Sequence, residues 1–312
     1  MSVVVHWHHE GPPEGPLAFF GTDAQHGRVS ELDLREAWAD LLTRRAAFAE
    51  SLAVYGEIVE RWAALTPSVT PLDPRGIDAR ALWERGVPLI AERPPSLSIE
   101  RVEELLGPTM DLIASIRGEE AVALQRFAEA WDAGAVGPAS LLPAKGRVGS
   151  VEPDVGLAPR TLAALASLAL RPFLAEYFRA VRADLDDGVW SLGICPFCGA
   201  PPAFGDVVED GRRRLGCHCC GGGWFFSRRQ CAFCGTDVAQ DLLRLDPDGR
   251  DEGYFISACT RCRAYVKELD RRVRWNAGSA LVEDWGSPHL DLVAERQGYW
   301  RPLPTLLQLA RS

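Results

Sequence analysis

The stretch CHCCGGGW, Cys217 to Trp224, places three cysteines and a histidine in four positions, directly before three glycines. Cys217 and Cys220 have the two-residue spacing that lets one tight turn direct two thiolates at a single ion. Three further pairs have this spacing, and all nine cysteines lie between Cys195 and Cys262. In a reducing compartment, cysteines clustered in this way are metal ligands more often than disulfides. The cysteine region therefore decides the fold of the second half of the chain.

The four pairs predict two successive metal sites. The intervals between the first two pairs and between the last two are 18 and 24 residues, which suits hairpins that bring two turns to one ion. Glycine follows the second cysteine in three of the pairs, where it relieves strain as the chain turns away from the metal. Arg263 occupies that place in the fourth pair, so a different backbone conformation is expected there. The predicted ligands are Cys195, Cys198, Cys217 and Cys220 in site 1, and Cys231, Cys234, Cys259 and Cys262 in site 2.

A closed site of four thiolates limits both the chemistry and the identity of the ion. It leaves no open position for a water molecule, which disfavours metal-assisted hydrolysis. Tetrahedral sulfur ligands suit either zinc or a single rubredoxin-like iron, and composition does not decide between them.

Cys219 is the ninth cysteine and has no partner in the spacing pattern. It is a candidate free thiol for which three interpretations remain: a solvent-facing thiol without a role, an alternative ligand, or a reactive sulfur near the metal. The spacing favours the first, because the middle residues of a C-x-x-C turn are expected to point outward.

Before the cysteines, the sequence predicts an all-helical domain. Apolar residues recur at alternating steps of three and four from Leu34 to Trp62, which indicates one long helix that starts after Ser30 and ends at Thr66-Pro67. Further helical patterns cover Ile99 to Leu106 and Met110 to Trp131, with interruptions expected at Gly107-Pro108 and Gly118. Another covers Thr161 to Leu185, and Pro172 is expected to kink or restart it.

After Trp190, short apolar runs and charged turns predict short strands joined by hairpins. The predicted fold class is α+β: an N-terminal all-α bundle followed by two consecutive rubredoxin-like or zinc-ribbon-like small β modules. A final helix is expected from Pro288 to Gly298, capped and decorated by Asp284, Asp291, Glu295 and Tyr299. The predicted divisions are a flexible tail (1–29), a helical domain (30–188), a first ribbon (189–228), a second ribbon (229–275) and a C-terminal helical segment (276–312). His6, His8 and His9 lie in the tail and are expected to be solvated.

Charge and hydropathy exclude several classes of function. The 312-residue chain has a formal net charge of −9, and residues 191–275 hold thirteen basic against eleven acidic residues, so the basic footprint of a nucleic-acid-binding protein is missing. No apolar run is long enough to cross a membrane, and the first residues lack the pattern of a secretory signal. We therefore expect a cytoplasmic protein. No glycine-rich nucleotide-binding loop occurs, which argues against an ATP-driven activity.

The order of the motifs resembles that of the FdhE family, the formate dehydrogenase accessory proteins. The resemblance covers roughly residues 160 to 302 and rests on SLGICPFCGAPP (191–202), RLGCHCCGGGWFFSRRQCAFCG (214–235), CTRCRAYVK (259–267) and HLDLVAERQGYWR (289–301). Trp224 and Arg228, four and eight residues after Cys220, match the family arrangement. The chain departs from the family at Arg263, where glycine is usual, and by adding Cys219.

The resemblance implies a cytoplasmic, non-enzymatic maturation factor. Such a factor binds the catalytic subunit of a molybdenum- or tungsten-dependent formate dehydrogenase and is required for its activity. Because family members resemble rubredoxins at their cysteine sites, the resemblance also places iron ahead of zinc. Two alternatives stay open: a rubredoxin-like redox or sulfur-handling protein, and a zinc-ribbon nucleic-acid-binding protein that would use Arg212 to Arg214 and the aromatic residues from Trp224 to Phe226.

Overall fold

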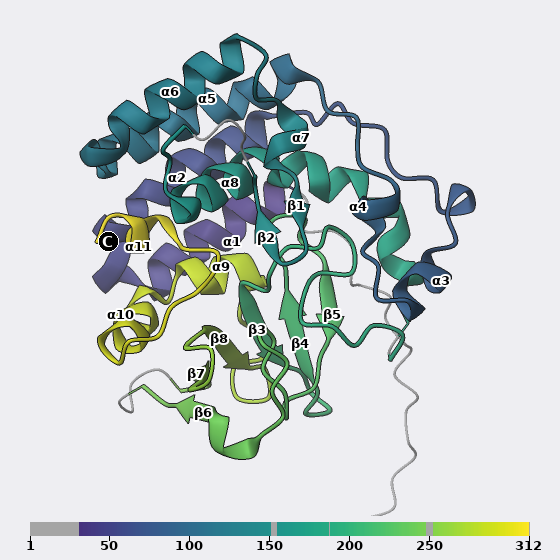
Figure 1. Ribbon diagram of the computed structural model, residues 1–312. Helices are drawn as coiled ribbons and strands as arrows, with labels where there is room; N and C mark the ends of the chain where they lie inside the picture. The colour runs from purple at the N-terminus through teal and green to yellow at the C-terminus, as the bar shows by residue number, and fades with distance from the viewer. Residues whose placement is uncertain (1–30, 151–154, 187, 248–251, 312) are drawn as a thin grey trace, which may run out of the picture.

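The first half of the chain forms the helical upper part of Figure 1. The computed structural model describes residues 31–150, 155–186, 188–247 and 252–311, so the predicted tail with His6, His8 and His9 lies outside the described residues. A short hairpin of β1 (Pro143–Ala144) and β2 (Arg147–Val148) interrupts the helices. The helices are α1 (Glu31–Arg44), α2 (Ala49–Ala64), α3 (Ala79–Glu84), α4 (Leu89–Glu92), α5 (Ile99–Ile116), α6 (Ala121–Asp132), α7 (Pro138–Leu141) and α8 (Pro159–Tyr177). The predicted N-terminal helical region is confirmed.

Helix α8 lies at the centre of this half and is buried on most sides. Pro172 removes one backbone N–H, which would leave the carbonyl of Leu168 without its helical partner. The indole Nε1 of Trp62 in α2 donates to that carbonyl at 3.0 Å. Helix α8 therefore continues through Pro172 to Tyr177, short of the predicted end at Leu185, and a 3-10 turn follows from Arg179 to Asp184.

Two further predictions about helix boundaries are wrong. The single helix expected up to Thr66 is divided into α1 and α2, because Arg45 leaves the helical conformation and its guanidinium lies 4.9 Å from the ring centre of Tyr254. The expected interruption at Gly107-Pro108 does not occur, since α5 runs through it from Ile99 to Ile116. The buried face of α5 packs against α8, and this packing outweighs the one hydrogen bond that proline removes.

The second half is built on one six-stranded sheet (Figure 1). The first ribbon supplies β3 (Phe204–Val207), β4 (Arg213–Gly216) and β5 (Gly223–Phe225), and the second supplies β6 (Leu242–Leu245), β7 (Tyr254–Cys259) and β8 (Tyr265–Asp270). The strand order is β5-β4-β3-β8-β7-β6, and all neighbours are antiparallel except β3 and β8. The α+β fold class and the short strands are confirmed. The two β modules are joined edge to edge by the parallel β3–β8 pairing.

The C-terminal helices connect the sheet to the helical half, and Figure 1 shows them in yellow between the two. Helix α9 (Ala280–Trp285) contacts α1 and β3, α10 (Pro288–Arg296) contacts β7 and β8, and α11 (Leu306–Leu309) contacts α2 and α8. The main hydrophobic core runs from Leu34 to Leu309 and includes cysteines of site 1. A second, smaller core lies between the sheet and α10. Within the described residues, no helix combines the length and the apolar character that a membrane span requires.

Candidate metal centres

The four C-x-x-C turns share one backbone geometry. We call them knuckles 1 to 4 and define them as residues 195–200, 217–222, 231–236 and 259–264. In each knuckle the amide of the fifth residue donates to the carbonyl of the first cysteine, and the amide of that cysteine donates to the carbonyl of the sixth residue. Two ribbons of different sequence therefore present their paired thiols from the same turn.

Arg263 adopts this geometry as well, so the expectation of a different conformation in knuckle 4 is wrong. The fifth residue of every knuckle has a positive φ, 73° at the three glycines and 60° at Arg263. A side chain is disfavoured in this left-handed region. Here the Arg263 guanidinium donates to the carbonyls of Gln297 and Gly298 and lies 4.1 Å from the ring centre of Tyr299. These contacts offset the backbone strain.

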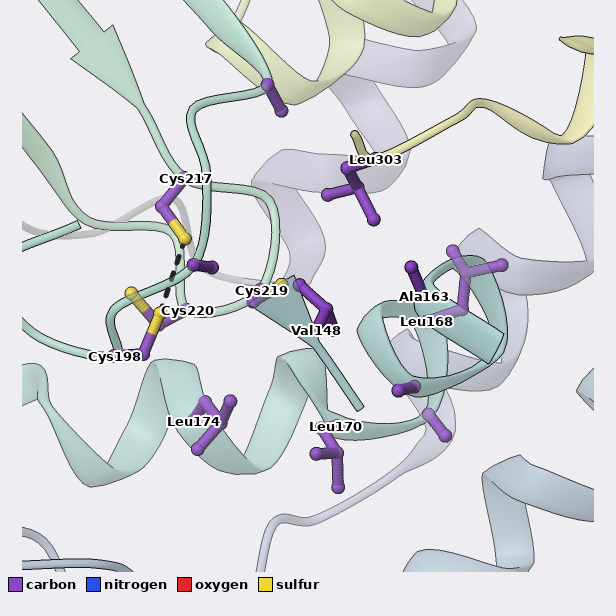
Figure 2. Close-up of a cluster of buried hydrophobic side chains, with 14 of the residues drawn as sticks. Val148, Ala163, Leu168, Leu170, Leu174, Cys198, Cys217, Cys219, Cys220 and Leu303 are labelled. Atoms are coloured by element: carbon purple, nitrogen blue, oxygen red, sulfur yellow. Dashed lines mark hydrogen bonds between the residues drawn. The ribbon is translucent and has the colours of Figure 1, made fainter. Parts of the chain in front are cut away.

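Site 1 brings together its four predicted ligands in a buried cluster. The Sγ atoms of Cys195 and Cys220 lie 3.5 Å apart, as do those of Cys198 and Cys217, and all four lie within 4.8 Å of one another. Four sulfur ligands at about 2.3 Å from a tetrahedral ion would be about 3.8 Å apart, so this cluster fits such an ion. Figure 2 shows the thiols of Cys198, Cys217 and Cys220 converging above α8.

Two arginines face knuckle 2 beside site 1. Arg171 of α8 donates to the carbonyl of His218 at 2.6 Å and to that of Cys217 at 3.4 Å. Arg182 donates to the carbonyls of Cys220 and Ala175. Four thiolates around a divalent ion would carry two negative charges, and a buried charge needs a nearby partner. The two guanidinium groups would supply that compensation when an ion is bound, and no sequence pattern points to them.

Site 2 repeats the cluster at the surface. Its Sγ pairs are 3.7 Å apart (Cys231 and Cys262) and 3.8 Å apart (Cys234 and Cys259), and all four thiols lie within 4.8 Å of one another. Cys234 is exposed and Cys262 is partly exposed. The geometry therefore suits a tetrahedral ion at both sites, but only at site 2 do sulfur atoms face the solvent side of the molecule.

The side chains of Asp241 and Trp300 hold the knuckles of site 2. The Asp241 carboxylate accepts from the hydroxyls of Thr236 and Thr260, both at 3.2 Å, and so joins knuckle 3 to knuckle 4. The indole Nε1 of Trp300, from the C-terminal segment, donates to the carbonyl of Cys262 at 3.1 Å. Trp300 itself remains 47% exposed, so an aromatic face lies at the solvent side of this site.

Cys219 does not face solvent, so that prediction is wrong. Its side chain has no exposed surface, and His218 beside it is also buried. Figure 2 shows Cys219 apart from the other three labelled thiols, on the side of Val148 and Leu303. A hydrogen bond with Cys217 and burial raise the pKa of the Cys219 thiol well above its usual value, which keeps it protonated. The geometry of a C-x-x-C turn alone predicts that the two middle residues are exposed. In the folded chain, the helical half and the C-terminal segment cover them.

A buried ionic cluster lies between β8 and the C-terminal helices, and its carboxylates do not decorate a helix surface as predicted. Lys267 Nζ lies 3.0 Å from Asp284 Oδ1 and 2.7 Å from Asp291 Oδ2. Arg301 Nη1 donates to Asp284 Oδ1 at 2.8 Å. Burial by itself would raise the pKa of Asp284, but Arg301 and Lys267 outweigh it and hold that pKa below its usual value. Both carboxylates are fully buried.

The ionic cluster reaches site 1 through His218 of knuckle 2. The Nδ1 atom of His218 lies 3.5 Å from Asp284 Oδ2. Burial lowers the pKa of His218 to about 3, so the ring is neutral at pH 7. The sequence carried one signal for this cluster: Lys267 is, with Lys145, one of only two lysines in the chain.

The other predicted carboxylate and tyrosine lie at the edge of this cluster. Glu295 accepts from Gln308 Nε2 at 2.7 Å and from Arg311 at 3.1 Å, and Tyr299 is buried in the smaller core. Glu295 thus ties α10 to the last residues of the chain, Tyr299 packs against the sheet, and neither contributes a ligand atom to the thiol clusters.

Trp224 and Arg228 occupy different environments. Trp224 is buried, and its indole Nε1 donates to the carbonyl of Leu192 at 3.1 Å, which fixes β5 to the segment before knuckle 1. Arg228 is exposed and donates to the carbonyl of Gly211 at 3.2 Å. Neither residue contributes a ligand atom to the thiol clusters.

Curated proteins similar to this chain carry the name protein FdhE homolog. A protein FdhE homolog from Stutzerimonas stutzeri (strain A1501) is 34% identical over 118 residues, which are 36% of this chain and 38% of the relative. A homolog from Pseudomonas aeruginosa is 31% identical over 128 residues, 38% and 40% of the two chains. A third, from Pseudomonas putida, is 27% identical over 158 residues, 48% and 49% of the two. The matches thus span between 38% and 49% of the length of these curated relatives.

A solved structure extends the likeness to the whole fold. The crystal structure of the FdhE protein from Pseudomonas aeruginosa matches with a TM-score of 0.55 and 22% identity, covering 89% of this chain and 96% of that one. No protein-family model matches the chain.

Proposed function

We propose that this chain, whose relatives and fold support the FdhE family, is an accessory maturation factor for formate dehydrogenase and not an enzyme. It acts by binding the catalytic subunit of a molybdenum- or tungsten-dependent formate dehydrogenase in the cytoplasm, and the enzyme depends on it for activity. The observation that carries the proposal is the pair of closed four-thiol clusters on a fold shared with a solved FdhE protein. Four protein ligands leave no coordination position for a substrate or a water molecule.

The two clusters are proposed to hold metal ions through the eight cysteines already named. The family resemblance favours iron, and zinc fits the same thiol distances. When bound, each ion would crosslink two knuckles and so contribute folding free energy. Residues around the clusters support this binding. Arg171 and Arg182 would compensate the negative charge of the thiolates at site 1, and Asp241 and Trp300 hold the turns of site 2.

A redox or sulfur-handling function is the second candidate, and the exposure of site 2 favours it. Cys234 is exposed and Cys262 is partly exposed, so a partner can approach the ligand sulfurs of this site directly. Site 1 gives no such access. Electron exchange would require iron, which absorbs visible light in a four-thiolate site. A colourless protein with stoichiometric zinc, purified from iron-replete cells, would exclude this candidate.

The structure offers little support for nucleic-acid binding through the Arg212 to Arg214 run. All three guanidinium groups already face carboxylates: Arg212 that of Asp210 at 2.6 Å, Arg213 that of Glu268 at 2.6 Å and Arg214 that of Asp206 at 3.1 Å. A phosphate-binding patch needs cations that are free to neutralise phosphates. Salt-sensitive binding to random DNA or RNA at physiological ionic strength would restore this candidate.

The proposed function is tested by capture of the client together with metal analysis. The tagged chain is co-expressed with the catalytic subunit of a formate dehydrogenase, and the captured subunit and the metal content of the chain are measured. We expect capture of the subunit and two metal ions per chain. As a control, the Arg229→Gln variant changes an exposed arginine outside both thiol clusters and should behave as wild type. A metal-loaded chain that captures no catalytic subunit, and whose loss leaves the enzyme active, would refute the maturation role.

A further inference from the structure

A pocket of about 170 Å³ lies beside site 2, on the face of the sheet away from the ionic cluster. Residues of β8 alternate between the two faces of the sheet. Lys267 reaches Asp284 on one side, whereas Val266 and Glu268 line the pocket on the other. The pocket wall nearest to site 2 includes Cys231 and Cys259, one ligand from each knuckle. Whatever fills this pocket therefore lies next to the metal ligands.

The floor of the pocket holds a buried arginine with spare hydrogen-bonding capacity. Arg213 is only 5% exposed, and its Nη2 lies 2.6 Å from Oε1 of Glu268. Its Nε has no hydrogen-bond partner among the described residues. A buried donor without an acceptor is destabilising, so an acceptor brought by a ligand would relieve that penalty. The Oε1 atom of Glu268, which lies within ion-pair distance of Arg213, likewise has no hydrogen-bond partner among the described residues.

Positive charge exceeds negative charge around the pocket. Among the described residues, Arg213, Arg228 and Arg244 line it, and Glu268 is the only carboxylate that does so. Arg244 lies 3.8 Å from the ring centre of Phe255 and is paired with Asp246 at 2.8 Å, so it is held at the wall. Arg228, by contrast, is exposed and contacts only a backbone carbonyl among the hydrogen bonds described here. The charge balance selects an anionic ligand.

The size and the apolar walls restrict the ligand further. Binding sites for drug-sized molecules and cofactors commonly occupy about 300–1,000 Å³, which is well above the volume of this pocket. Phe233, Phe255 and Val266 form apolar walls above the charged floor. The pocket thus suits a single carboxylate on a short apolar stem, which is the chemistry of an aspartate or glutamate side chain.

The surface beside the pocket carries both signs of charge. Knuckle 4 holds Arg261 and Arg263, whereas Asp237 and Asp241 follow knuckle 3. The Arg263 guanidinium donates to the carbonyls of Gln297 and Gly298, and the Asp241 carboxylate accepts from Thr236 and Thr260. The charge that favours an anionic ligand is therefore that of Arg213 and Arg228 at the pocket itself.

We propose that this pocket receives an aspartate or glutamate side chain of the bound client protein, with Arg213 and Arg228 as its ligands. The identity of the client rests on the proposed function. Seating the acidic side chain here brings the surface of the client against Cys231 and Cys259, and the exposed Cys234 lies at the same site. A free small carboxylate shares this chemistry, so the test separates the two sources.

The first arm of the test uses a small probe on the full metal-loaded chain. N-acetyl-glutamate N-methylamide and its glutamine counterpart are titrated, and binding is followed by ligand-observed NMR. We expect the glutamate probe to bind at least tenfold more tightly than the glutamine probe, as for a charge-assisted hydrogen bond to arginine. Arg228→Gln should weaken the glutamate probe several-fold, whereas Arg229→Gln, which alters the neighbouring exposed arginine, should not. Equal binding of both probes, equal effects of both variants, or no binding at all would overturn the proposal.

The second arm measures capture of the formate dehydrogenase catalytic subunit by the same variants. We expect Arg228→Gln to weaken capture several-fold and Arg229→Gln to leave it unchanged. If the glutamate probe binds as predicted but wild type captures no subunit, the proposed client is wrong and the carboxylate site stands as a site for small carboxylates. If the subunit is captured but Arg228→Gln captures it as well as wild type, the pocket proposal fails and the maturation role stands. Arg213→Lys, checked by its metal content, should reduce both readouts because it keeps the charge facing Glu268 but removes Nε.

Discussion

The two thiol clusters have the same turns and nearly the same sulfur spacing, but opposite surroundings. Site 1 is part of the main hydrophobic core and faces Arg171 and Arg182. Its knuckles contain no charged side chain, because His218 is neutral at pH 7. Site 2 lies at the surface, with Cys234 exposed and arginines around it. The coordination motif is therefore not enough to assign a role. Burial makes site 1 a structural centre, and exposure makes site 2 the one that a partner can reach.

The strongest test of this difference is removal of one ligand from each site. Cys195→Ser should abolish folding, because structural metal binding supplies on the order of 10 kcal/mol and the whole domain is stable by only about 5–15 kcal/mol. Cys231→Ser should lose the second ion and loosen β6 and knuckle 3, while the helical half remains folded. Far-UV circular dichroism melts and metal content would distinguish the two variants. A Cys195→Ser chain that melts like Cys231→Ser would show that the sites do not differ in this way.

The ionic cluster beside site 1 should give the next largest effect. Asp284→Asn leaves Lys267 and Arg301 buried with one carboxylate fewer, and breaking a buried pair costs about 3–5 kcal/mol. Asp241→Asn, the matched change at site 2, affects part-buried hydrogen bonds and should cost about 1 kcal/mol. Denaturant unfolding at pH 7 measures both.

The same aspartate predicts a pH dependence. Its pKa is lower in the folded chain than the value of about 3.9 in an unfolded one, so its stabilisation is complete above that pH and is lost as the pH falls through the folded pKa. The difference in unfolding free energy between wild type and Asp284→Asn should therefore shrink below about pH 4. A difference that stays constant down to pH 3 would contradict the assignment.

Metal release should separate the two sites kinetically. A chelator reaches site 2 through the exposed Cys234, whereas site 1 opens only when the surrounding core opens. We expect biphasic release of two ions, with the fast phase at least tenfold faster. Cys231→Ser should remove the fast phase and leave the slow one. Two ions released at one rate would indicate that burial does not protect site 1.

The smallest effect is expected at Cys219. Cys219→Ser places a hydroxyl in a buried position and should lower the unfolding free energy by about 1 kcal/mol, at the low end of the cost of burying a polar group. Metal content and client capture should be unchanged, since Cys219 is in neither thiol cluster. Loss of the site 1 ion in this variant would instead identify Cys219 as a ligand.

The sequence predicted local features well and long-range ones poorly. Spacing alone identified the eight clustered cysteines, because a C-x-x-C turn is a local structure, and periodicity identified the helices. The burial of Cys219 and of Asp284 depends on segments far away in the chain, and no local pattern contains that information. Arg263 shows the same limit in the backbone: its side chain predicts a change of turn, but contacts with residues 297–299 hold the turn that glycine has elsewhere.

The parallel pairing of β3 with β8 sets an order for the assembly of the chain during synthesis. Phe204 pairs with Lys267, 63 positions later, so β3 presents an open edge until the second ribbon has emerged. An open strand edge is prone to pairing with other chains, and contacts between distant residues form slowly. The first ribbon can close around its ion while the second is still being made, but the newborn sheet is protected from aggregation only when residues 265–270 arrive. A chain truncated before Tyr265 should therefore aggregate even when its first site is filled.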